Sequence, residues 1–131
     1  MSMYESGLSV QAGDIVQAEV RSGKYVGEVV EVHGPRAVVK ILAVLKHPDQ
    51  GDLHRPYDPD AAMFHERRAL SFTEKTTVPL SGLKRYGGEV PDYRESLLAA
   101  VEAEIGAVDR LRRWCEQSLE LLQELQKDYR K

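Results

Sequence analysis

The most constraining feature of this sequence is a series of short runs rich in β-branched residues, separated by tight-turn signals. The runs span Asp14–Val20, Lys24–His33 and Arg36–Leu45. The turns between them, Arg-Ser-Gly at 21–23 and His-Gly-Pro at 33–35, are good turn formers, because glycine reaches positive φ and proline fixes φ near about −65°. Three such runs in succession predict an antiparallel meander.

A long polar segment at 46–65 then interrupts the β pattern. It contains three prolines and four aspartates and offers almost nothing to bury. Loops of this length are uncommon in compact domains and are often functional. After it, Arg67–Phe72 and Thr76–Val78 are predicted to be two further strands. Pro79–Tyr86 is predicted to be a 3₁₀ turn that leads into a last extended piece.

Five short strands with a 3₁₀ turn before the last residues predict an α+β, mainly β, fold. We expect a small five-stranded SH3-like barrel at 13–90, preceded by a leader at 1–12. The opening segment Ala12–Val16 and the closing segment Thr77–Leu83 are typical of such barrels. A five-stranded OB-type barrel has a similar sequence pattern and stays open as an alternative.

From Pro91 onward the spacing of apolar residues becomes helical. Pro91 and Asp92 suit the N-terminus of a helix, where proline costs no hydrogen bond and a carboxylate meets free N–H groups. Gly106 and Asp109 interrupt the apolar pattern, so we expect a C-terminal pair of helices within 91–131. One long kinked helix is the alternative.

The second half of this helical element carries an unusually apolar stripe. We expect the stripe to dock on the barrel or on the first helix. The alternative is a partner-binding groove or a homodimer through the C-terminal helices. The stripe consists of Trp114, Leu121, Leu122, Leu125 and Tyr129.

Composition narrows the classes of function. The 131 residues are 42% hydrophobic and 30% charged, with a formal net charge of −3, which indicates a folded domain without a net basic field. We therefore expect no nucleic-acid partner. Nucleic-acid binding by the barrel stays an alternative function, with these residues as its basic patch: Lys24, Arg67, Arg68, Lys84 and Arg85.

The sequence gives no indication of secretion or membrane insertion. The longest apolar run, Ile41–Leu45, is far shorter than the ~20 residues of a membrane-spanning helix. The N-terminal residues show no signal-peptide pattern and no early cysteine that could carry a lipid. The single cysteine, Cys115, fits a reducing compartment. We expect a cytoplasmic protein.

Three of the four histidines fall in or beside the long loop. His47, His54 and His65 could ligate a metal ion together with nearby carboxylates, although their spacing matches no standard zinc motif. Ordering of the loop by hydrogen bonds, or a binding surface, is the preferred interpretation. The sequence contains no nucleophile elbow and no phosphate-binding loop. We expect no enzymatic activity and no cofactor.

Several blocks of this sequence resemble the kinase-associated protein B family of spore-forming bacilli. The blocks are SGKYVGEV at 22–29, VLKHP at 44–48, QGDLH at 50–54, FHERRAL at 64–70 and LQKDY at 125–129. Together with shorter matches they extend over nearly the whole chain. The resemblance implies a regulatory protein, because such proteins support the activity or expression of a membrane-bound sensor histidine kinase that feeds the sporulation phosphorelay.

The resemblance also implies a partner and a surface. The partner would be that kinase or a component of its signalling pathway, which would place the protein at the membrane only peripherally. The most distinctive blocks coincide with the long loop and with 64–70, so we predict a partner-binding surface there. We expect its residues to contribute more to partner binding than to folding. They are Asp49, Asp52, His54, Phe64, Arg67 and Arg68.

Overall fold

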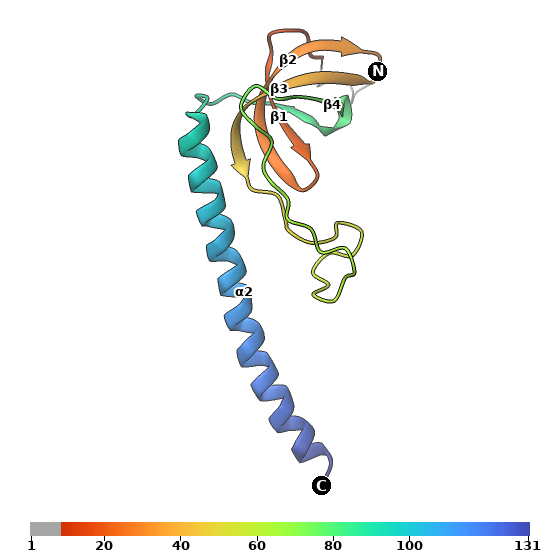
Figure 1. The fold of residues 1–131 in the computed structure, drawn as a ribbon, viewed down its shortest axis with the longest axis vertical. Coiled ribbons are helices and arrows are strands. Elements are labelled where there is room, and N and C mark those ends of the chain that lie inside the picture. The colour runs from red at the N-terminus through yellow and green to blue at the C-terminus, as the bar shows by residue number, and fades with distance from the viewer. Residues whose placement is uncertain (1–8) are drawn as a thin grey trace.

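A five-stranded antiparallel sheet followed by one long helix makes up the structure, a computed structural model that describes residues 9–131 (Figure 1). This architecture confirms the predicted α+β, mainly β, class. The predicted leader, residues 1–12, lies largely outside the described residues. The elements are β1 (Ile15–Val20), β2 (Gly23–His33), β3 (Arg36–Lys46), β4 (Lys75–Pro79), a 3₁₀ turn (Leu80–Gly82), β5 (Leu83–Arg85) and α2 (Tyr93–Tyr129).

The sheet has the strand order β4-β3-β2-β1-β5. Its strands alternate between buried apolar residues and more exposed ones, as expected for a sheet with one covered face. The sheet curls so that all five strands contribute to one core, and the 3₁₀ turn precedes the last strand. The core residues are Val16, Ala18, Val29, Ala37, Val39, Val78 and Leu83.

The predicted strand Arg67–Phe72 is wrong, because this segment lies outside the sheet. The fifth strand of the sheet is instead β5, which pairs with β1 and falls within the stretch predicted as a 3₁₀ turn. Ala69 and Leu70 instead pack against a second core around the buried ring of Tyr25. The apolar residues of 67–72 thus reflect packing rather than strand pairing, and the strand-free segment between β3 and β4 extends over 47–74.

The predicted pair of helices is also wrong, because α2 is one continuous helix of 37 residues. It begins as expected at Asp92, whose side chain accepts a hydrogen bond from the Glu95 N–H at 3.0 Å. Gly106 is exposed and does not interrupt the helix. Asp109 does not cap a second helix; its carboxylate pairs with Arg112 at 2.7 Å and with Arg113 at 3.1 Å, one turn further along the same helix.

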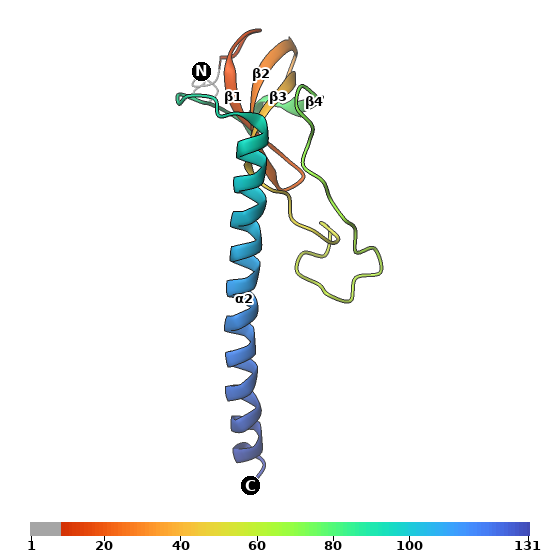
Figure 2. The ribbon, with the colours of Figure 1, turned by 60° about the vertical axis from the view of Figure 1, so that its left-hand side comes forward.

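Only the first turns of α2 pack on the sheet. The side chains of Ser96 and Ala100 are buried there, and Ser96 Oγ accepts a hydrogen bond from the Val44 N–H at 3.0 Å. Figures 1 and 2 show that the second half of the helix extends free of the sheet. The expected docking of the apolar stripe is therefore wrong: Trp114 is 67% exposed and Leu122 61% exposed. Within residues 9–131, none of the helical structure is apolar enough over a sufficient length to cross a bilayer.

Candidate functional site

The candidate site is the strand-free segment 47–74, which we call the loop, together with the face of α2 beside it. The two arms of the loop run side by side, since the Gly51 N–H donates to the His65 carbonyl at 2.9 Å. The side chain of Gln50 joins the same arms, because its amide donates to the Arg67 carbonyl at 2.9 Å and accepts from the Arg67 N–H at 2.7 Å. The loop therefore has an ordered base.

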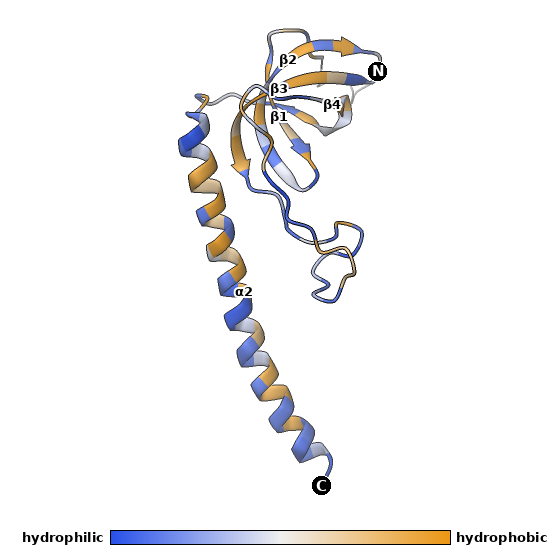
Figure 3. Cartoon of the chain, in the orientation of Figure 1, coloured by the Kyte–Doolittle hydropathy of each residue, from blue (hydrophilic) through white to orange (hydrophobic). Residues whose placement is uncertain are grey.

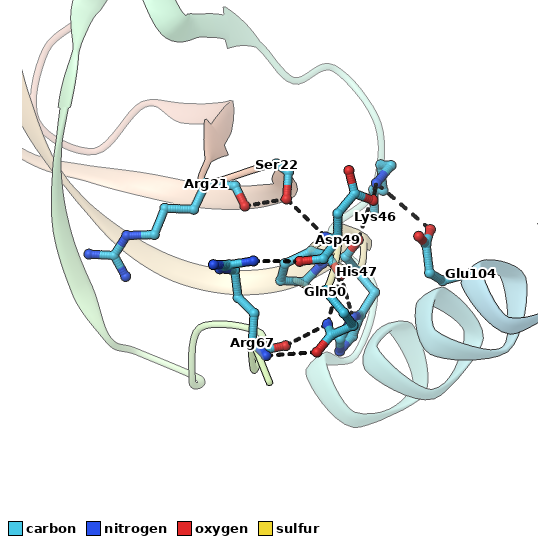
Figure 4. Close-up of polar contacts among 9 residues, drawn as sticks. Arg21, Ser22, Lys46, His47, Asp49, Gln50, Arg67 and Glu104 are labelled. Carbon is cyan, nitrogen blue, oxygen red and sulfur yellow. Dashed lines mark hydrogen bonds and ion pairs between the residues drawn. The ribbon is translucent and has the colours of Figure 1, made fainter. Parts of the chain in front are cut away.

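Arg67 and Asp49 connect this base to the sheet (Figure 4). The Arg67 guanidinium donates to the Asp49 carbonyl at 2.8 Å, and the Asp49 N–H donates to Ser22 Oγ at 2.9 Å. Ser22 and Arg21 form the two-residue turn between β1 and β2 and both have positive φ, as the tight hairpin requires. The hydrogen bonds of Arg67 and Asp49 thus join the base of the loop to the turn between β1 and β2.

Lys46, the last residue of β3, connects the loop to the helix. Its Nζ lies 3.1 Å from Asp49 Oδ1 and 3.7 Å from Glu104 Oε1 on α2 (Figure 4). Burial by itself lowers the pKa of Lys46, but the hydrogen bond that its ammonium donates to the Asp49 carboxylate and the nearby Glu104 carboxylate outweigh it, so that the net pKa is raised. The charged ammonium is therefore favoured in the folded protein.

Two tyrosines hold the C-terminal arm of the loop. The hydroxyl of Tyr25 accepts a hydrogen bond from the Leu70 N–H at 3.2 Å, and the hydroxyl of Tyr93 donates to the Leu70 carbonyl. Burial raises the pKa of Tyr25 and also that of Tyr93. Both backbone groups of one loop residue are thus satisfied by side chains from β2 and α2.

We expect the free energy of unfolding to fall as the pH rises above about 10. Tyr25 and Lys46 both have pKa values raised above their ordinary values of 10.0 and 10.5, so the folded state keeps protons that the unfolded state has begun to lose. Their contribution is complete below pH 10 and is lost through the raised pKa values. Urea unfolding between pH 8 and 12 measures this slope. Tyr25→Phe should make it shallower; equal slopes in this variant and the wild type would contradict the assignment.

The loop and the middle of α2 enclose a groove with a volume of about 370 Å³. Apolar side chains from the loop and from the helix line it, among them Leu53, Tyr57, Phe64, Val108 and Leu111. The carboxylates of Asp52, Asp58 and Glu104 also contribute to its walls. Gly51 is required here, because it has φ +95° and a Cβ would lie 2.9 Å from the Phe64 ring.

A different set of loop residues is exposed and does not line the groove: His54, His65, Glu66 and Arg68. We call these the outer loop residues. The turn before them is fixed by Asp52, whose carboxylate accepts from the His54 N–H at 2.9 Å. Arg68 forms a 3.4 Å ion pair with Glu66, with both side chains more than three-quarters exposed.

The predicted site residues therefore have three different environments. Asp49 and Arg67 hold the loop, Asp52 and Phe64 line the groove, and His54 and Arg68 are outer loop residues. Sequence reasoning missed the helical wall of the groove and the role of Gln50. No local signal could have identified them, since each depends on a residue at least 17 positions away.

The other two proposed constellations gain no support from the arrangement. His47 Nδ1 lies 3.0 Å from the Pro48 carbonyl, and over residues 9–131 no three His, Cys, Asp or Glu side chains are grouped as a metal site requires. Of the basic residues considered for nucleic acid, Arg85 lies 3.6 Å from Asp14, and Arg67 and Arg68 make the contacts described above.

Comparisons with known proteins agree with the resemblance seen in the sequence. Residues 20–130 match the family model described as Kinase associated protein B. The chain is 41% identical over 120 residues to the kinase-associated lipoprotein B of Bacillus subtilis (strain 168), covering 91% of this chain and 94% of that protein. It is 44% identical to a crystal structure of kinase-associated protein B from Bacillus cereus, with a TM-score of 0.69 over 94% of this chain and 100% of that one. This chain belongs to the kinase-associated protein B family.

Proposed function

We propose that this protein is a non-enzymatic regulator that supports the activity or expression of a sporulation sensor histidine kinase feeding the phosphorelay. It acts through protein–protein contacts, with the kinase or a component of its pathway as partner. Membership of the family supports the link to a kinase. The Bacillus subtilis relative is named a lipoprotein. In our proposal this chain works in the cytoplasm and reaches the membrane through the kinase.

The observation that carries the proposal is the contrast between the base of the loop and its outer residues. The base is held in place by the hydrogen bonds of Gln50 and Arg67 and by the hydrogen bond between the Leu70 N–H and the Tyr25 hydroxyl. The outer loop residues are charged or titratable and lie exposed on this ordered support. Such preorganisation lowers the entropy lost on binding, so polar side chains presented in this way suit recognition of another protein.

The first test is the double variant His54→Ala with Arg68→Ala. Because both side chains are exposed and outside the groove, its stability should stay within about 0.5 kcal/mol of the wild type. Affinity for the kinase-containing membranes should fall at least about tenfold, since contacts at an interface centre are worth on the order of 2 kcal/mol. Thermal melting, co-sedimentation with bacillus membranes and a phosphorelay reporter in a strain without its own copy measure the three effects.

A matched control uses the same two residue types at another place. His33→Ala with Arg36→Ala alters the exposed turn between β2 and β3 and should leave melting, binding and signalling unchanged. If the loop variant signals like the wild type with an unchanged melt, the outer loop residues are not the contact surface. A large drop in its melting temperature would show instead that they are structural.

A further inference from the structure

The free half of α2 continues a repeat that begins where the helix packs on the sheet. Leu97, Val101 and Glu104 face the sheet side and are half-buried. Val108 and Leu111 line the groove, and the positions after them contact neither the sheet nor the loop (Figures 1 and 2). Figure 3 shows apolar residues recurring along the whole helix. The repeat alternates steps of three and four: Leu97, Val101, Glu104, Val108, Leu111, Cys115, Ser118, Leu122, Leu125 and Tyr129.

This spacing is the one that lets a helix keep a single face against another helix over many turns. Three of the flanking positions, Trp114, Leu119 and Leu121, are apolar as well and more than half exposed. Most charged residues lie outside the repeat, and Arg112, at the edge of the face one heptad before Leu119, bonds to Asp109 and Glu116 within the same helix. A wide, nearly uncharged face of this kind is normally buried against another apolar surface rather than left exposed to water.

We propose that a second copy of this chain covers this face, with its α2 antiparallel to the first and its C-terminal turns along the groove. The inference rests on the helix and the groove and goes beyond the proposed function, because it does not depend on any kinase contact.

The repeat defines a register for this pair. With the two-fold axis between residues 116 and 117, Val108 faces Leu125 of the partner subunit, and Leu111 faces Leu122 of the partner subunit. Cys115 faces the partner's Ser118 next to the axis, where small side chains allow a close approach. Each copy therefore places its largest apolar side chains on both sides of a compact centre.

Charge favours the antiparallel orientation. The helix has a basic stretch at 110–113, with three arginines, and an acidic stretch at 116–124, with three glutamates. The antiparallel register aligns each stretch mainly with the opposite one on the other copy, whereas a parallel pair in register would align like with like. In this register the basic C-terminal residues Lys127, Arg130 and Lys131 of each copy also come level with the part of the other copy's α2 that carries Glu102 and Glu104.

The surface is large enough for a stable dimer. Eight exposed apolar side chains from Val108 to Tyr129 lie on this face. If each loses about 75 Å² of exposed apolar surface, the two copies bury about 1,200 Å² in total, the lower bound of specific interfaces. The groove contacts add to that area. The eight are Val108, Leu111, Trp114, Leu119, Leu121, Leu122, Leu125 and Tyr129.

Sedimentation equilibrium of the full chain tests the dimer, which we expect at micromolar concentration. Leu122→Asp should weaken the dimer at least 100-fold, because it places a charge in the apolar seam on both copies. Gln123→Asp adds the same charge one residue later, outside the repeat, and should leave the dimer intact. A wild-type chain that stays monomeric at about 100 μM overturns the proposal and assigns the face to a different protein. An equal response of the two variants overturns the seam.

Disulfide trapping tests the orientation without relying on a destabilising charge. In a Cys115→Ser background, a Val108→Cys chain mixed with a Leu125→Cys chain should form the mixed disulfide, and neither chain should trap itself. Self-trapping of the Leu125→Cys chain would show a parallel pair and overturn the antiparallel register. The His54→Ala, Arg68→Ala variant should still dimerise, so loss of signalling and loss of the dimer are separate results.

Discussion

Replacing Gly27 with alanine should lower the free energy of unfolding by about 1–3 kcal/mol, a large share of the stability of a domain this size. Gly27 lies in β2 between β1 and β3, where a Cβ would approach Val39 Cγ1 to 2.3 Å and the Lys40 carbonyl oxygen to 2.9 Å. The Val39 side chain is fully buried, and the carbonyl belongs to a paired strand, so neither can move freely. Urea unfolding at fixed protein concentration measures the loss.

Gly106→Ala is the matched control, since it makes the same chemical change where a Cβ would meet nothing within 4 Å. In the middle of a helix that change should raise stability by about 0.5–1 kcal/mol. Val39→Ala combined with Gly27→Ala should recover part of the loss, because it removes one of the two clashing atoms. Equal stabilities of the Gly27→Ala variant and the wild type would show that the sheet at this point is not closely packed.

The sheet could be predicted from the sequence where a local pattern decides the structure. β1, β2 and β3 begin and end close to the expected residues, because β-branched runs and glycine-containing turns are signals within one hairpin. The fifth strand could not be located in this way. Arg67–Phe72 has the apolar residues of a strand. The backbone N–H and carbonyl of Leu70, however, are hydrogen-bonded to the hydroxyls of Tyr25 and Tyr93, which come from distant parts of the chain.

The prediction of two C-terminal helices was wrong for the opposite reason, because it relied on local signals alone. Gly106 and Asp109 are typical of helix ends, but a break is stable only if the second helix gains packing by turning back. The second half of α2 has no such packing on the sheet, since the buried residues of α2 are Ser96 and Ala100, near its start. Asp109 then finds its partners, Arg112 and Arg113, on the continuous helix.

The sequence indicated the long loop as the candidate site, but it did not indicate the different environments of the loop residues. The loop could be identified because long polar segments without secondary structure are uncommon in compact domains and are often functional. The separate parts played by Arg67, Phe64 and His54 depend on contacts with Asp49, Gly51 and Asp52 and on the position of α2. Spacing along the chain contains no information about that position, so the groove could not be foreseen.

Tyr25→Ala should be the most damaging single substitution considered, with a loss of about 3–5 kcal/mol. The ring is 1% exposed and lies at the centre of the core that joins Ile41 and Val44 of β3 to Ala100 of α2. Its hydroxyl also holds the Leu70 N–H. The substitution therefore leaves a cavity between sheet and helix and releases the C-terminal arm of the loop. Urea unfolding measures the first effect and hydrogen exchange at 65–72 the second.

Tyr25→Phe separates the two effects, because it keeps the packing and removes only the hydroxyl. We expect a loss of about 1 kcal/mol and faster exchange of the Leu70 amide in a protein that is otherwise folded. If the ordered base of the loop is what presents His54 and Arg68 to the kinase, signalling should also fall in this variant while the dimer persists. Faster exchange at Leu70 with undiminished signalling would mean that the outer loop residues bind without being held, and preorganisation would lose its part in the mechanism.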